Sequence, residues 1–184
     1  MKTYNLMALR WPILAMTCVL VVSNIAVMYA INDWLTWGAF TYPLVFLVTD
    51  LTNRTLGATA ARKVALVGFA LAVVLSVYLA TPQIALASGA AFLTAQMLDI
   101  TAFNRLRTLS WWKAPLIGSL LASVIDTGIF FYIAFYGSDM NWLTLAAGDL
   151  AMKCFMAAIL LLPYKLLLPR FGAMPDDTTA RSTA

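Results

Sequence analysis

Long apolar runs separated by short polar segments set the pattern of this chain. A helix needs about 20 residues to cross the hydrocarbon core of a bilayer, and residues 11–31 form an uncharged run of that length. Residues 64–98 are also uncharged, but Pro82 divides this longer run because proline suits the first turn of a helix. The pattern predicts six membrane-spanning helices, over residues 11–31, 39–56, 64–80, 82–103, 115–137 and 142–168.

The two ends of the chain flank this predicted bundle. The first apolar run begins after Lys2 and Arg10 and so resembles a signal peptide, but it is too long and no small-residue cleavage site precedes Asn32. We therefore expect it to be retained as the first helix. Residues 169–184, rich in Ser, Thr and Ala, predict a disordered cytoplasmic tail after one membrane domain formed by residues 1–168.

Lys and Arg alternate between the segments that join the predicted helices. The segment before the first helix and those after the second, fourth and sixth helices carry them, whereas the other three connecting segments carry none. Because cytoplasmic segments are enriched in Lys and Arg, we predict that both termini lie in the cytoplasm. The residues are Lys2, Arg10, Arg62, Lys63, Arg105, Arg107, Lys113, Lys165, Arg170 and Arg181.

Composition restricts the class of protein. Hydrophobic residues make up 62% of the chain and charged residues 11%, against roughly 25% charged in a soluble domain, which indicates an all-α integral membrane protein. The net charge of +4 comes from short clusters between apolar runs, a pattern typical of membrane topology and not of nucleic-acid binding. The chain has no His and no Glu, which excludes His-based catalysis and His-ligated metals. We predict no catalytic residue, metal or cofactor.

Besides Arg54 and Lys165 near the cytoplasmic ends, four aspartates and one lysine lie inside the predicted helices, namely Asp50, Asp99, Asp126, Asp149 and Lys153. A charge at bilayer depth costs about 2.5–3.5 kcal/mol on insertion scales and marks a bundle interior or a polar pathway. At about 1.5 Å rise per residue, Asp50, Asp126 and Lys153 fall near the middle of the membrane. The same count places Asp149 one turn nearer the outside and Asp99 near the cytoplasmic end.

Polar and aromatic residues recur at helical spacing around these charges. Residues three or four apart share one face of a helix, and such faces on several helices would enclose a cavity. A cavity of this kind can both hydrogen-bond and stack on a flat polar ligand. The faces are Phe46, Asp50, Asn53 and Gly57; Phe92, Gln96, Asp99 and Phe103; Ser119, Ser123, Asp126 and Phe130; and, more faintly, Thr17 and Asn24.

Two of the carboxylates have a basic residue four positions later on the same predicted helix. Asp50 precedes Arg54, and Asp149 precedes Lys153, in the acid-first order that favours an ion pair within a helix. A structural ion pair and a contact with a ligand therefore both stay open for Asp50 and Asp149.

The other two carboxylates differ in what surrounds them. Asp99 precedes Arg105 by six residues, and we interpret both as anchors at the cytoplasmic end of their helix. Asp126 has no cation on its own helix. It therefore needs a partner on another helix, such as Lys153, or a ligand.

Residues 37–54, which read WGAFTYPLVFLVTDLTNR, contain the densest motif of the chain. This segment is similar to the WGAF, (F/Y)P and FL-x-TDL signature of the VUT family of queuosine-precursor transporters. The resemblance extends from about Ser23 to Lys165 with its blocks in order. The further blocks are Ser23-Asn24; Gln96–Asp99 with Phe103–Arg107 and Trp111-Trp112; Asp126-Thr127 with Phe130-Phe131 and Ala134-Phe135; and Asp149-x-x-x-Lys153.

The resemblance implies a bacterial inner-membrane importer of 7-cyano-7-deazaguanine, and of its 7-aminomethyl relative, for queuosine salvage in tRNA. A deazaguanine presents a ring N–H and an exocyclic amine that one carboxylate can accept together. Lipid and this small molecule are then the partners, and a homo-oligomer stays open. The candidate substrate-binding residues are Asp126 or Asp50 for the two donors; Phe46, Phe130 and Trp37 for stacking; Gln96 and Asn24 for the carbonyl and remaining ring edge; and Asn53, Asp149 and Lys153.

Two other functions compete with this one. The family's six-helix fold resembles the substrate-binding subunits of ECF-type ABC importers, which dock a coupling protein through Ala-x-x-x-Ala at the cytoplasmic end of the first helix. In the first predicted helix the pattern occurs only at Ala26 and Ala30, at the outer end. An intramembrane lipid-modifying enzyme is disfavoured because the chain lacks His, Glu and a paired-carboxylate metal motif. The sequence leaves the energy source and the preferred precursor open.

Overall fold

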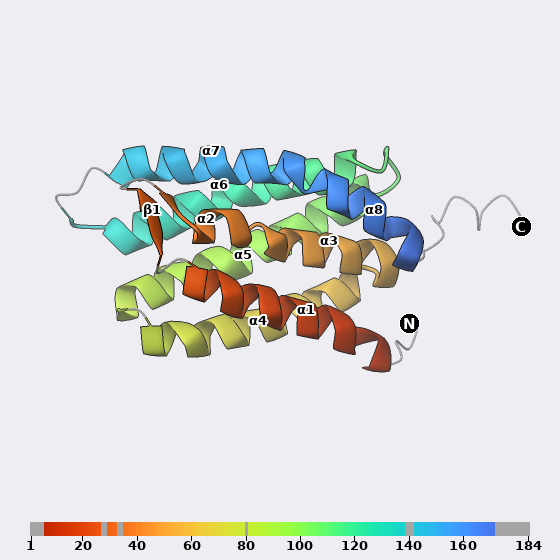
Figure 1. Ribbon diagram of the computed structural model, residues 1–184, viewed down its shortest axis with the longest axis horizontal. Coiled ribbons are helices and arrows are strands. Elements are labelled where there is room, and N and C mark those ends of the chain that lie inside the picture. Colours follow the sequence, from red (N-terminus) through yellow and green to blue (C-terminus); the bar gives the residue numbers. More distant parts are fainter. Residues whose placement is uncertain (1–5, 27–28, 33–34, 80, 139–141, 172–184) are drawn as a thin grey trace, which may run out of the picture.

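The structure is a computed structural model that describes residues 6–26, 29–32, 35–79, 81–138 and 142–171 (Figure 1). The helices run roughly along one axis, and α1 begins at the same end of the bundle at which α8 ends. A small antiparallel hairpin joins the first two helices. The elements are α1 (Leu6–Ala26), β1 (Ala30–Asn32), β2 (Leu35–Thr36), α2 (Gly38–Thr41), α3 (Leu44–Leu56), α4 (Ala58–Leu79), α5 (Pro82–Leu106), α6 (Lys113–Phe135), α7 (Trp142–Ile159) and α8 (Leu161–Phe171).

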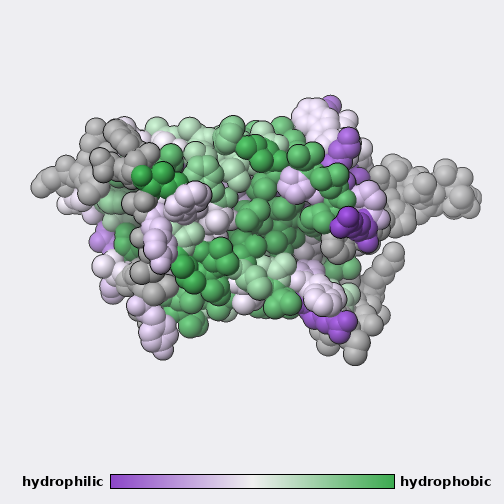
Figure 2. Space-filling model, in the orientation of Figure 1, coloured by the Kyte–Doolittle hydropathy of each residue, from purple (hydrophilic) through white to green (hydrophobic). Residues whose placement is uncertain are grey.

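Five helical segments within the described residues are long and apolar enough to cross a membrane. Figure 2 shows a broad hydrophobic band around the middle of the bundle, with strongly hydrophilic residues mainly at the end where α1 begins and α8 ends. Leu86 and Leu143 are each 65% exposed on the outer surface, which suits lipid and not water. The predicted all-α membrane bundle is confirmed. The segments are Ala8–Ala26, Ala58–Ser76, Pro82–Leu106, Lys113–Phe135 and Trp142–Arg170.

The remaining crossing is a broken helix. We predicted one helix over residues 39–56, but the chain forms α2 and α3 with Pro43 between them. Proline has no N–H to donate within a helix, so helical hydrogen bonding is interrupted there. Together α2 and α3 lead from the hairpin toward the opposite end of the bundle (Figure 1), so they complete the sixth crossing.

The first helix also differs from the prediction. It begins at Leu6 and ends at Ala26, about five residues earlier than the predicted span of residues 11–31. The reason is that Ala30–Asn32 pairs with Leu35–Thr36 as a hairpin, which takes these apolar residues out of the helix. Residues 27–28 lie outside the described part.

The last crossing consists of α7 followed directly by α8. Pro163 cannot donate a hydrogen bond to the Ile159 carbonyl, and the α-helix is interrupted at Leu160. α8 then continues to Phe171, so residues 169–171 are helical although we predicted a disordered tail from residue 169. The rest of that predicted tail, residues 172–184, lies outside the described residues.

α5 lies at the centre of the bundle and packs against α6, α4 and α3. A Cβ atom at Gly118 would lie 2.7 Å from Asp99 Oδ1, so glycine allows α6 to approach the α5 carboxyl closely. On the other side, Met16, Leu20 and Val64 are fully buried where α1 meets α4. This packing holds the polar faces of α3, α5 and α6 inside the bundle.

We expect Ser138, after α6, to lie outside the cell and Ser110, before α6, to lie inside. In a Cys18→Ala/Cys154→Ala background, Ser138→Cys should react with an impermeant thiol reagent added to intact cells. Ser110→Cys should react only after the cells are opened, because its loop follows Arg105 and Arg107. The reverse labelling pattern would contradict the predicted orientation.

Candidate functional site

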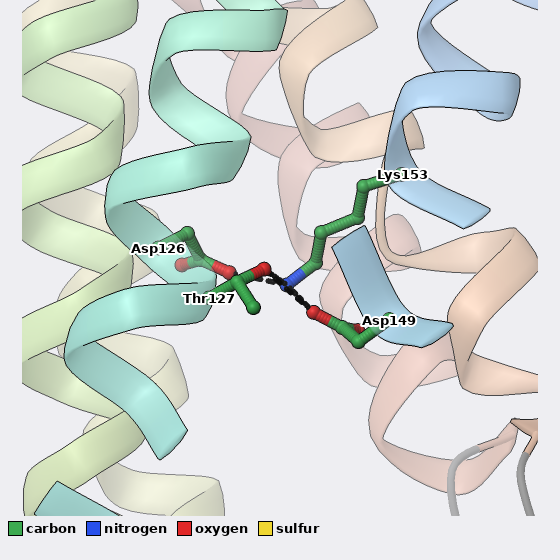
Figure 3. A network of polar contacts seen from close by, with 4 residues as sticks. All are labelled: Asp126, Thr127, Asp149 and Lys153. Carbon is green, nitrogen blue, oxygen red and sulfur yellow. Dashed lines mark hydrogen bonds and ion pairs between the residues drawn. The ribbon is translucent and has the colours of Figure 1, made fainter. Parts of the chain in front are cut away.

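A cluster of charged side chains joins α6 and α7 inside the bundle (Figure 3). Lys153 Nζ donates to Asp126 Oδ2 at 2.7 Å, to Thr127 Oγ1 at 3.1 Å and to Asp149 Oδ2. Thr127 Oγ1 in turn donates to Asp149 Oδ2 at 2.7 Å. Both partners that we proposed for Lys153, Asp149 on its own helix and Asp126 on another, are therefore in contact with it.

This α6–α7 cluster, formed by Asp126, Thr127, Asp149 and Lys153, carries two carboxylates and one ammonium. Asp126 and Lys153 are 4% and 7% exposed, whereas the Asp149 side chain is 25% exposed. An ammonium has three N–H groups, and Lys153 has three acceptors. All three N–H groups of Lys153 are therefore used within the cluster, while carboxylate oxygens remain as free acceptors and one negative charge is in excess. This arrangement favours ligands that bring N–H groups.

A second polar group lies where α3, α5 and α6 meet. The Asp50 and Asp99 carboxyl groups lie within hydrogen-bonding reach of each other, and Ser119 lies beside Asp50. Asp50 is 3% exposed and Asp99 fully buried. Among the described residues, neither Asp99 oxygen nor Asp50 Oδ1 has a hydrogen-bond donor. We call Asp50 and Asp99 the acid pair.

The acid pair changes two of our expectations. Arg54 does not pair with Asp50, because its Nη1 donates instead to the Arg107 carbonyl at 2.6 Å. Asp99 does not anchor the helix end, because its side chain points into the bundle while Arg105 is exposed. The face of α5 that carries Asp99 turns toward α3 and α6.

Both polar groups border one internal cavity between α3, α6, α7 and α8. Its volume is about 20 Å³, room for about one water molecule, so a bicyclic ligand requires the helices to separate. Polar and charged groups from three helices meet an aromatic wall there. The lining residues are Pro43, Phe46, Leu47, Asp50, Pro115, Ser119, Ser123, Lys153, Ala157, Leu160, Leu161 and Tyr164.

The amide side chains of Gln96 and Asn53, both candidate substrate-binding residues, form hydrogen bonds between α3 and α5. Thr49 Oγ1 donates to Gln96 Oε1 at 2.6 Å, and Asn53 Nδ2 donates to the Ile100 carbonyl at 3.1 Å. All of these side chains are buried. They brace α3 against α5 behind the cavity rather than lining it.

Three further candidates lie away from the cavity. Asn24 Nδ2 donates to the Leu20 carbonyl of its own helix at 2.9 Å. Trp37 is 56% exposed and contacts Phe40 with ring centroids 6.0 Å apart. Phe130 packs edge-on against Phe131. Of the ten candidate substrate-binding residues, the structure brings Phe46, Asp50 and Lys153 to the cavity wall, with Asp126 and Asp149 bonded to Lys153.

Sequence reasoning missed two polar residues that complete the site, Thr127 and Tyr164. The Thr127 hydroxyl donates to Asp149 and accepts from Lys153, which also binds Asp126. The sequence signal for Thr127 was its place directly after Asp126 in a block shared with the family. Ser119 and Ser123, which we had placed on a polar face with Asp126, line the cavity. Tyr164 is buried at the wall with its hydroxyl unpaired among the described residues, and no pattern in the sequence distinguished it.

A membrane bundle whose buried charges border an internal cavity has the architecture of a solute transporter. A family model described as "Putative vitamin uptake transporter" matches residues 36–81 and 76–167. The chain belongs to this family. No solved structure shows a significant match.

Two relatives carry more specific names. A "Queuosine precursor transporter" of Escherichia coli is 32% identical over 197 aligned positions, which cover 91% of this chain and 89% of that protein. A "Probable queuosine precursor transporter" of Haemophilus influenzae is 37% identical over 154 positions, covering 70% of this chain and 66% of that protein. The resemblance seen in the sequence is confirmed at the level of the family.

Proposed function

We propose that this protein imports queuosine precursors, with 7-cyano-7-deazaguanine and its 7-aminomethyl relative as substrates, across the bacterial inner membrane. The observation that carries the proposal is the relative named a queuosine precursor transporter that aligns over 91% of this chain. The chemistry of the cavity wall agrees with such a ligand. The protein moves its substrate and does not convert it.

The Asp126–Lys153 pair matches one edge of a deazaguanine. That edge presents a carbonyl acceptor, then a ring N–H and then an exocyclic amine. Lys153 supplies a donor and the two Asp126 oxygens supply acceptors, in the same donor–acceptor–acceptor order. Charge-assisted hydrogen bonds of this kind are short and strong, and Lys153 exchanges one of its present partners for the ligand carbonyl.

The remaining wall suits the flat ring and the substituent. Phe46 is 4% exposed and lines the cavity, where it offers a stacking face. The excess negative charge of the α6–α7 cluster favours the cation of the aminomethyl precursor. Because the closed cavity has room for about one water molecule, the ligand binds in a more open form.

Feeding cells that lack both precursor synthesis and their own transporter tests the function. We expect this chain alone to restore queuosine in tRNA when 7-cyano-7-deazaguanine is supplied, while a vector control and Lys153→Ala do not. Extracted precursor should be chemically unchanged. Restoration that required an added ECF coupling module and ATPase would support the ECF subunit instead, and no restoration under any condition would refute the proposed substrate.

A further inference from the structure

The acid pair of Asp50 and Asp99 has no role in the proposed ligand contacts, although it is the most deeply buried charge-bearing group in the described part of the chain. Asp50 comes from α3 and Asp99 from α5. Their carboxyl groups face each other across the contact between these helices. A Cβ atom at Gly118 of α6 would lie 2.7 Å from Asp99 Oδ1, so glycine lets α6 pack closely over Asp99.

Two facing carboxyl groups attract each other only through a proton. A carboxylate accepts hydrogen bonds but donates none, whereas a protonated carboxyl group donates one. Because both Asp99 oxygens and Asp50 Oδ1 lack any other donor among the described residues, the contact between the two side chains is a hydrogen bond when exactly one of them is protonated. With no proton it would be two like charges in a medium of low dielectric constant.

The acid pair also has a route to the cavity. Asp50 lines the cavity together with Ser119 and Lys153, and its buried Oδ1 has no partner in the described part of the chain. Asp99 lies behind Asp50 and is fully buried. A proton that reaches the pair therefore passes through Asp50, from the space that the ligand occupies.

The charged groups around the acid pair do not neutralise it. On α3, Arg54 donates to the Arg107 carbonyl, and both arginines lie near Tyr164 of α8. On α7, Lys153 is bound by Asp126 and Asp149, the only salt bridges within the described residues. Arg62 and Lys63 of α4 are exposed. The titratable groups facing the pair from neighbouring helices are thus Tyr164 and the already paired Lys153.

We propose that the acid pair is the proton-coupling site of the transporter, an inference that rests on the proposed import function. When the cavity opens outward, the acid pair takes up one proton from the outer solution through Asp50. The pair holds that proton while the substrate is bound, and releases it to the cytoplasm when the cavity opens inward. No bond of the substrate changes, and import dissipates the proton gradient.

Proteoliposomes containing the full chain test the coupling. Labelled 7-cyano-7-deazaguanine should exchange across the membrane at equal pH, and an acidic outer solution should drive its accumulation up to about tenfold per unit of pH difference for one proton per neutral substrate. Asp99→Asn keeps the size of the side chain. It should retain exchange at equal pH but lose both accumulation and substrate-dependent proton entry.

Thr101→Val is the matched control, since Thr101 lies two residues away on α5 and, among the described residues, its hydroxyl bonds only the Met97 carbonyl of its own helix. It should accumulate substrate as the unsubstituted chain does. Accumulation by Asp99→Asn equal to that of Thr101→Val would overturn the proposal, as would accumulation driven by a sodium gradient in place of a proton gradient. Absence of exchange in the unsubstituted chain would refute the import function itself.

Infrared spectroscopy of the purified protein tests the shared proton independently of transport, and so separates a failure of the coupling proposal from a failure of the import function. Near neutral pH, the shared proton should give a carboxylic acid band that remains in Thr101→Val and disappears in Asp50→Asn/Asp99→Asn. Because Asp126 and Asp149 are unchanged in both variants, a band that only Asp50→Asn/Asp99→Asn loses belongs to the acid pair. A spectrum of the unsubstituted chain without that band would overturn the shared proton, whatever the transport result.

Discussion

Lys153→Met is expected to destabilise the protein more than any other single substitution in the site, by about 3–5 kcal/mol. The substitution keeps the length of the side chain but removes the cation that holds Asp126 and Asp149 together. Asp126 is 4% exposed, so its charge would be left buried without a partner. The free energy of unfolding in detergent and the yield of folded protein measure the effect.

Two further variants identify the cause. Lys165→Met removes an exposed lysine of α8 that lies over the Trp111 ring at 5.1 Å, and should change stability by less than about 1 kcal/mol. Lys153→Met/Asp126→Asn removes the stranded charge as well, and should recover much of the lost stability without recovering transport. A Lys153→Met protein as stable as Lys165→Met would show that the ion pairs do not hold α6 to α7.

Asp126→Asn is expected to weaken binding of 7-cyano-7-deazaguanine by about 10- to 100-fold. The amide replaces one acceptor oxygen with a donor that opposes the ligand's own N–H, and a charge-assisted hydrogen bond worth roughly 1.5–3 kcal/mol is lost. Stability should fall less than in Lys153→Met, because Lys153 keeps Thr127 and Asp149. Ligand affinity and melting temperature are measured on the same purified protein.

Asp149→Asn is the informative comparison, since it removes the other carboxylate that Lys153 contacts. If Asp126 contacts the ligand, Asp126→Asn loses far more affinity than Asp149→Asn at a similar melting temperature. If Asp126 only holds Lys153, both variants lower the melting temperature and keep their affinity. A thermally normal Asp126→Asn protein with unchanged affinity would remove Asp126 from the site.

The free-energy cost of burying a charge was the most useful guide from sequence to site. It identified Asp50, Asp126 and Lys153 as interior residues, and the spacing of four identified the Asp149–Lys153 pair. These rules depend only on the depth of a residue in the membrane and on its spacing along one helix, and both can be read from a single sequence.

The pairing between helices was beyond those rules. Asp99 meets Asp50 and not Arg105 because of the rotation of α5 within the bundle, and Arg54 finds a backbone carbonyl instead of the carboxylate one turn before it. Thr127 was missed because a hydroxyl in a membrane helix ordinarily bonds the carbonyl one turn earlier. Pro43 is visible in the sequence, but the helix over residues 39–56 was predicted from the length of the apolar run alone. The break between α2 and α3 was therefore not predicted.

The small size of the cavity has an electrical consequence. A file of water molecules through a membrane protein conducts protons whether or not a substrate is present, and so short-circuits the membrane. Here the cavity beside Asp50 and Lys153 has room for about one water molecule, and apolar packing of Phe46, Ala95 and Ala122 adjoins it. We therefore expect this form of the bundle not to conduct protons through the cavity, so that a cell can keep many copies of it at rest without discharging its membrane potential.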